Sequence, residues 1–150
     1  MTLTIVHTGP IDLAVLADSL NAVAEQHSRY ATATGAEING DQVRLYIREI
    51  RAGSIVVELV ALAQNFPMFG AIGAANTVIT FTKHLGGFIQ YFLGRSAHPP
   101  PHTKAEDARS LSRIVAPIAK DAGANLTIEA RDNAIVVVNQ HVNSNEANAI

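Results

Sequence analysis

The stretch 43-VRLYIREIRAGSIVVELVA-61 decides the fold, because it reads as two strands joined by a tight turn. Apolar and polar residues alternate in both halves, the pattern of a half-buried antiparallel hairpin. A two-residue turn at Gly53-Ser54 would place Glu49 opposite Glu58, a pair of like charges. A three-residue loop would place Arg48 opposite Glu58 and keep the apolar side chains on one face. We therefore predict the three-residue loop.

The rest of the chain supplies partners for this hairpin. A second hairpin is predicted over 125-NLTIEARDNAIVVVNQHV-142, with its turn at Asp132-Asn133, and a further strand over 2-TLTIVH-7. Helices are predicted over residues 10–30, 68–94 and 103–122. The order β-α-β-β-α-α-β-β indicates an α+β fold, with an antiparallel sheet of about five strands and helices packed on one face.

Capping signals set the expected helix boundaries. Pro10 is predicted at the first position of the first helix, which should run to about Tyr30. Thr103 and Glu106 form a predicted capping box for the third helix, and Gly123 ends that helix. The predicted apolar stripe of the first helix consists of Leu13, Leu16, Leu20, Val23, Ala24 and His27.

The 150 residues have the length of one domain, which we place at 1–142. Residues 143–150 are predicted to be a C-terminal extension or the start of a further helix, with Asn143 or Ser144 as N-cap and Glu146 in the first turn. The chain begins without a basic segment followed by an apolar one, so no signal peptide is predicted and a cytoplasmic location is expected. The lack of cysteine fits a reducing compartment and excludes thiolate chemistry.

The composition and the motifs argue against most enzyme classes. The formal net charge is −2, and the chain has no Trp, three Tyr and five Phe, so nucleic acid is an unlikely partner without a local basic patch. The glycines around Gly70 and Gly73 do not complete a dinucleotide fingerprint, and no phosphate loop with Gly-Lys-Ser/Thr occurs. No serine has the context of a nucleophile elbow. We predict no cofactor, no metal and no catalytic residue, and we favour a protein that is not an enzyme.

The stretch 68-MFGAIGAANTVITFTKHLGGFIQYFLG-94 is the longest apolar run of the chain. Its uncharged part is about 17 residues long, which is short for a bilayer span, and Lys83 and His84 then interrupt it. Three interpretations stay open: the central helix of the core, a surface for self-association or for a protein partner, and a segment that inserts into a membrane after a conformational change. The candidate interaction residues are Phe69, Ile72, Phe81, Leu85, Phe88 and Phe92.

The six histidines give no metal-binding spacing. His98 and His102 flank three prolines, and a polyproline II segment would hold these two residues roughly 12 Å apart. We therefore interpret residues 95–102 as a rigid connector, with a docking segment for an aromatic groove as the alternative. His7, His27, His84 and His141 lie in four different predicted elements, and nothing in their spacing predicts that they converge.

One strand carries alternating basic and aromatic residues, namely Arg44, Tyr46 and Arg48, with Arg51 near the turn. Such a face could bind phosphates and stack one ring on a base or another flat ligand. The competing interpretation is a solvent-exposed face whose arginines pair with Glu49 or Glu58. This group is the candidate site for an anionic ligand.

The sequence as a whole favours an interaction domain that binds itself or another protein through the apolar helix at 68–94. A membrane-active protein that releases this helix is the first alternative. A domain that binds an anionic ligand or nucleic acid on the Arg44/Tyr46/Arg48 face is the second.

Overall fold

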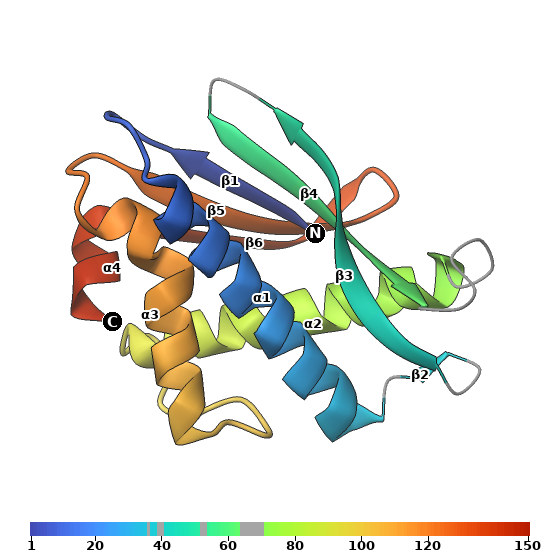
Figure 1. Ribbon diagram of the computed structural model, residues 1–150. Helices are drawn as coiled ribbons and strands as arrows, with labels where there is room; N and C mark the ends of the chain where they lie inside the picture. Colours follow the sequence, from blue (N-terminus) through green and yellow to red (C-terminus); the bar gives the residue numbers. More distant parts are fainter. Residues whose placement is uncertain (36, 39–40, 52–53, 64–70) are drawn as a thin grey trace.

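The computed structural model describes residues 1–35, 37–38, 41–51, 54–63 and 71–150, and all of their side chains except those of 37–38, 41–43, 46–51, 61–63 and 71–75 (Figure 1). Its strands are β1 (Thr2–Val6), β2 (Glu37–Ile38), β3 (Asp41–Arg51), β4 (Ile55–Ala63), β5 (Asn125–Asp132) and β6 (Ile135–Asn143). Its helices are α1 (Leu13–Thr34), α2 (Ala71–Phe92), α3 (Ala105–Ala119) and α4 (Ser144–Ala149).

The predicted α+β fold with an antiparallel sheet is confirmed. The strands lie in the order β2-β3-β4-β1-β5-β6, and every pair of neighbours is antiparallel. β1 pairs with β4 on one side and with β5 on the other, so the N-terminal strand joins the two predicted hairpins into one sheet. The expected five strands become six because the short strand β2 pairs with the start of β3.

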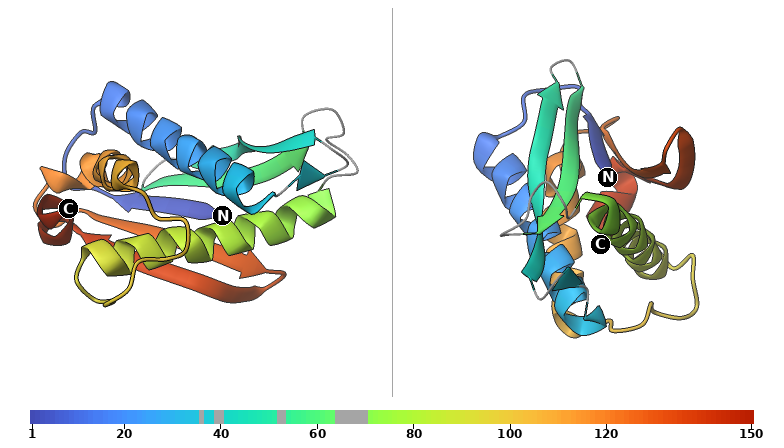
Figure 2. Two further views of the ribbon diagram at one scale, coloured as in Figure 1. Left: turned by 90° about the horizontal axis from the view of Figure 1, so that it is seen from below. Right: turned by 90° about the vertical axis from the view of Figure 1, so that its right-hand side faces the viewer.

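One face of the sheet forms the core. Leu3 lies opposite both Val57 and Ile128, and all three side chains are buried on the same face because opposed residues point the same way. The helices cover this face: α1 and α3 lie side by side, and α2 runs along β4, β5 and β6 (Figure 2). The predicted packing of helices on one face is therefore confirmed.

The apolar run forms α2, and protein covers the described part of it within the chain. Phe81, Leu85, Phe88 and Ile89 are at most 2% exposed and pack in the interior. Among the described residues, no helix is long and apolar enough to cross a membrane. The core-helix interpretation of this segment therefore accounts for the buried aromatic residues.

Two glycines let α2 approach its neighbours closely. A Cβ atom on Gly86 would lie 2.9 Å from Cγ of Gln140 on β6, and one on Gly87 would lie 3.0 Å from Cγ of Pro100. The amide of Gln90 donates a 2.6 Å hydrogen bond to the Gln140 side chain beside this contact. Glycine lowers helix stability by about 1 kcal/mol relative to alanine, so two in succession indicate a packing requirement.

Replacing Gly86 with leucine should lower the free energy of unfolding by roughly 1–3 kcal/mol, because the added atoms displace Gln140 and separate α2 from β6. Urea denaturation followed by circular dichroism measures this change. Gly9→Leu is the matched control, since a Cβ on Gly9 meets no atom within 4 Å. Equal stability of the two variants would contradict the close-packing explanation.

The predicted register of the first hairpin is wrong near its turn. Glu49 lies opposite Glu58, and Arg51 lies opposite Val56, which is the register of a two-residue turn. A β-bulge between Ile47 and Glu49 then shifts the pairing by one residue, so the predicted register holds only from Ile47 outward. Because of the bulge, residues near the turn keep the register of a two-residue turn, and residues beyond the bulge keep the register that was predicted from the apolar pattern. A prediction that assumes one uniform register does not include this arrangement.

The first helix is displaced along the chain from its prediction. It begins after Asp12, whose carboxylate accepts hydrogen bonds from the backbone of Ala14 and Val15, so Pro10 lies outside the helix. It continues to Thr34 and ends at Gly35, which has a φ of 65°. Most of the predicted stripe faces the core, because Val23 and His27 are buried and Leu16 and Leu20 pack against the core, whereas Leu13 is 78% exposed. The other buried positions of α1 are Ser19, Ala22, Gln26 and Ala31.

The observed boundaries of α3 and of the second hairpin turn differ from the predicted ones by one to a few residues. The N-cap of α3 is Lys104, whose backbone N–H donates to the Asp107 carboxylate at 2.6 Å, so the predicted Thr103/Glu106 box is wrong by one position. The helix ends at Ala119 and does not reach Gly123. The turn of the second hairpin lies at residues 133–134, where Asn133 has a φ of 54°. The predicted N-cap Asn143 is confirmed at α4.

Candidate functional site

A small pocket opens where α1, α2 and the start of α3 meet. Its volume is about 30 Å³, enough for one or two water-sized groups. The lining is unusually rich in ionisable and aromatic side chains for a domain with 16% charged residues. The lining residues are Gln26, Arg29, Tyr30, Ala33, His84, Phe88, His102, Lys104 and Asp107.

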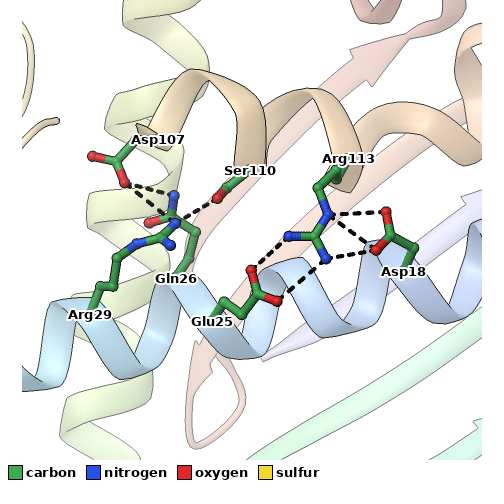
Figure 3. A network of polar contacts seen from close by, with 7 residues as sticks. All are labelled: Asp18, Glu25, Gln26, Arg29, Asp107, Ser110 and Arg113. Atoms are coloured by element: carbon green, nitrogen blue, oxygen red, sulfur yellow. Dashed lines mark hydrogen bonds and ion pairs between the residues drawn. The ribbon is translucent and has the colours of Figure 1, made fainter. Parts of the chain in front are cut away.

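Asp107 is the buried acidic group of this pocket, with 4% of its surface exposed. One carboxylate oxygen accepts a 2.9 Å hydrogen bond from the Gln26 amide, and Arg29 forms a 3.5 Å ion pair with the same oxygen. The other oxygen accepts the backbone N–H of Lys104. Two side chains of α1 (Figure 3) and the N-cap backbone of α3 therefore satisfy the carboxylate.

Arg29 supplies a half-buried positive charge beside Asp107. One terminal nitrogen donates to the hydroxyl of Ser110 at 2.5 Å and also faces Asp107. The Nε atom of the same guanidinium is buried and forms no hydrogen bond with any described residue. A buried donor without an acceptor is unfavourable, so an acceptor placed at this nitrogen would stabilise the site.

Three aromatic rings in contact with one another form the opposite wall. The His84 ring lies 4.7 Å from the Tyr30 ring and 4.5 Å from the Phe88 ring, measured between ring centres. Burial lowers the pKa of His84, while the negative charge of Asp107 acts to raise it and His102 acts to lower it. His84 is therefore a half-buried imidazole whose protonation depends on the charge in the pocket.

A second set of ion pairs holds α1 and α3 together next to the pocket. The guanidinium of Arg113 donates to Asp18 at 2.6 Å and to Glu25 at 2.6 Å, two residues that lie about two turns apart on α1 (Figure 3). The hydrogen bonds from Arg113 lower the pKa of Asp18. All three side chains are substantially exposed, so this network orients the two helices and adds little stability.

The structure places most of the candidate interaction residues of the apolar helix in the interior. Phe81, Leu85 and Phe88 are buried, and Phe92 is half-buried against the core. The side chains of Phe69 and Ile72 lie outside the described residues. The described part of this group is thus a packing surface within the chain.

The candidate anion site on β3 is only partly described. Arg44 is exposed, while the side chains of Tyr46, Arg48 and Arg51 lie outside the described residues. The backbone bulge at Arg48 interrupts the alternation that aligned these residues in the sequence. No described contact joins Arg44 to a second basic or aromatic side chain.

The histidines separate into different environments. His98 is exposed on the connector, but the predicted rigid polyproline geometry is wrong at its end, because His102 has a φ of 65° and Thr103 donates its N–H back to Pro100. This turn places His102 in the pocket that His84 also lines. No group of three or more potential metal ligands occurs among the residues that the structure describes.

A second notable surface lies on the edge strand β6. Ile135, Val136 and Val137 are 71%, 42% and 38% exposed, and they follow one another in the sequence. Among the described strands, β5 alone pairs with β6, so the outer edge of β6 is free. The sequence predicted a hairpin that contains these residues, but its pattern does not indicate that their strand lies at the edge of the sheet.

The sequence patterns also did not predict the pocket residues. The spacing of Gln26, Arg29 and Tyr30 puts them on one side of α1, which was a usable signal, but Asp107 and His102 join them only through tertiary packing. Comparisons with known protein families, with curated proteins and with solved structures find no match to this chain.

Proposed function

We propose that this domain acts by self-association, with two copies joined edge to edge through β6. The observation that carries the proposal is the run of three exposed aliphatic residues, Ile135 to Val137, on a strand with a free edge. An edge strand presents unpaired N–H and C=O groups, and a second strand can satisfy them while it covers the aliphatic side chains.

The charges along the two sides of the sheet favour a second copy of this chain as the partner that pairs with β6. At the other end of the sheet, among the described residues, β2 pairs only with Asp41 and Gln42 of β3. The rest of β3 contains Arg44, Arg48, Glu49 and Arg51, and charges of this kind discourage strand addition. The nine residues of β6, 135-IVVVNQHVN-143, include no Lys, Arg, Asp, Glu or Pro. Two antiparallel copies of β6 therefore meet without like-charge repulsion between their side chains.

The geometry of β6 is also compatible with strand addition. A bulge shifts its pairing with β5 only near the turn, between Ala130 and Arg131, and Val138 to Asn143 pair regularly. The polar residues Asn139 and His141 are exposed on this regular part. They can hydrogen-bond across the new pair, while the aliphatic residues at 135–137 supply the apolar contact.

The test is the oligomeric state of the protein over a range of concentrations, measured by analytical ultracentrifugation. We expect a reversible dimer, and we expect Ile135→Lys combined with Val137→Lys to weaken dimerisation by at least about tenfold, because each copy would bring two positive charges to the junction. A dimer rather than a larger assembly is expected, because each copy offers one such edge.

Leu13→Lys is the matched control, since Leu13 on α1 is also aliphatic and is 78% exposed. This variant should dimerise like the unmodified protein. A strict monomer at high concentration would overturn the proposal, as would equal effects of the α1 and β6 substitutions. The absence of cysteine agrees with a cytoplasmic site of action, which we propose with the same function.

A further inference from the structure

We infer that the pocket between α1, α2 and α3 binds the oxyanion head group of a small ligand, a carboxylate or a tetrahedral anion such as a phosphate or sulfate group. This site is distinct from the proposed β6 interface, and the inference does not depend on self-association. Its four basic side chains are Arg29 on α1, His84 on α2, and His102 and Lys104 in the segment that leads into α3.

The charge balance of the lining favours an anion. Among the described residues that line the pocket, Asp107 is the only acidic one, and its two oxygens already accept hydrogen bonds from Gln26 and the backbone of Lys104 and face Arg29. The fixed positive charges of Arg29 and Lys104 therefore exceed the negative charge of Asp107 before His84 takes up a proton. A cation would face these positive charges, and the carboxylate of Asp107 is already engaged by its donors.

The hydrogen-bonding state of Arg29 points to the same ligand class. Its Nε atom is buried and has no acceptor among the described residues, although the guanidinium is held in place by Ser110 and Asp107. A planar guanidinium that is already oriented loses little freedom when it binds an oxygen. The Arg29 side chain is 33% exposed, and an oxyanion at its accessible part would receive charge-assisted hydrogen bonds, which are the strong ones.

The size and the shape of the pocket limit the ligand. A volume of about 30 Å³ admits a few oxygen atoms but not a whole cofactor. The rings of Tyr30, His84 and Phe88 form an apolar wall beside the charges. The pocket thus suits an anionic head group whose remaining part extends outward along exposed Ala33 and His102.

Binding should strengthen as the pH falls. Burial lowers the pKa of His84, and a bound anion would oppose this effect. The ionisable groups that face His84 are Arg29 and Tyr30 from α1, Asp107 from α3, and His102 and Lys104 from the connector. Proton uptake by His84 adds positive charge in the pocket without changing Arg29 or Lys104.

The test is titration with sulfate and with acetate, followed by two-dimensional NMR of the 15N-labelled protein with chloride added to equalise ionic strength. Neither probe changes its charge between about pH 5.5 and about pH 8, so a pH effect reports on the protein. We expect saturable shifts at the pocket residues that are larger at the lower pH. Tighter binding of sulfate would indicate a tetrahedral ligand group, and tighter binding of acetate would indicate a carboxylate.

Arg29→Gln and Lys104→Gln should each weaken binding by about tenfold or more, because each removes a charged donor. Lys120→Gln is the matched control, since Lys120 is exposed at the other end of α3 and does not line the pocket. Lys104 is exposed, so its variant keeps the test valid if the Arg29 variant does not fold. Absence of saturable binding of both anions, or equal loss of binding in the Lys120 variant, would overturn the inference.

Discussion

Replacing Phe81 with alanine should lower the free energy of unfolding by about 3–5 kcal/mol, the largest effect that we expect from a single substitution. Phe81 is completely buried, and its ring lies 5.1 Å from the ring of His27 and 5.8 Å from the ring of Tyr30. The truncation removes the contacts of Phe81 with His27 and Tyr30 of α1 and leaves a cavity in the core. Chemical denaturation at neutral pH measures the loss.

The neighbouring residue Thr80 supplies the matched control for this substitution. Thr80 is exposed on the same helix, and its hydroxyl hydrogen-bonds only to carbonyl oxygens of the preceding turn, at Asn76 and Thr77. Thr80→Ala should therefore change the stability by less than about 0.5 kcal/mol. If Phe81→Ala were equally harmless, α2 would not be the core helix, and an interface or membrane role for its apolar face would again be open.

Acidification from about pH 6.5 to about pH 4 should remove roughly 3 kcal/mol of stability through one residue, His27. The ring of His27 is fully buried, and neither of its nitrogens has a hydrogen-bond partner among the described residues. Burial lowers the pKa of His27 to about 4. The unfolded chain binds a proton near pH 6.5 and the folded chain only near pH 4, so the unfolded state gains relative stability throughout this interval and not below it.

His27→Leu should remove most of this acid sensitivity, because leucine fills a similar volume and has no nitrogen to desolvate or protonate. Urea denaturation at several pH values between about 4 and about 7 gives the dependence directly. His98→Leu is the control, since His98 is exposed on the connector, and this variant should keep the acid sensitivity. A His27→Leu variant with an unchanged pH dependence would assign the effect to other groups, beginning with His84, whose pKa burial also lowers.

Periodicity in the sequence predicted the kinds of element well and their boundaries less well. The hairpins at 43–61 and 125–142 and the strand at 2–7 all exist, because alternation of side chains is a local property of a strand. The helix ends were displaced because several nearby residues could act as caps. At α3, Lys104 is the N-cap and Asp107 closes the turn in place of the predicted Thr103 and Glu106. The choice between such neighbours depends on what packs around them.

The candidate functional sites were predicted less well from the sequence than the strands and helices were. The basic and aromatic alternation at Arg44, Tyr46 and Arg48 is visible in the sequence, but a bulge at Arg48 interrupts it. The pocket joins Arg29, His84 and Asp107, which are separated by dozens of positions, and the spacing of residues along the chain does not report such convergence. A turn at His102 adds the last histidine, against the straight connector that three prolines predicted.

The sequence by itself determined the α+β class, the antiparallel hairpins and the apolar character of the segment that became α2. These features follow from short-range patterns, because burial of one face imposes a repeat of two residues on a strand and of about 3.6 on a helix. Only the tertiary structure decided that β1 joins the two hairpins, that β6 lies at the end of the sheet among the described strands with Ile135 to Val137 exposed, and that the chain covers the described part of α2. The physical reason is that neighbour relations between elements arise from packing across long chain separations, where many arrangements satisfy the same local pattern and the fit of side chains selects one.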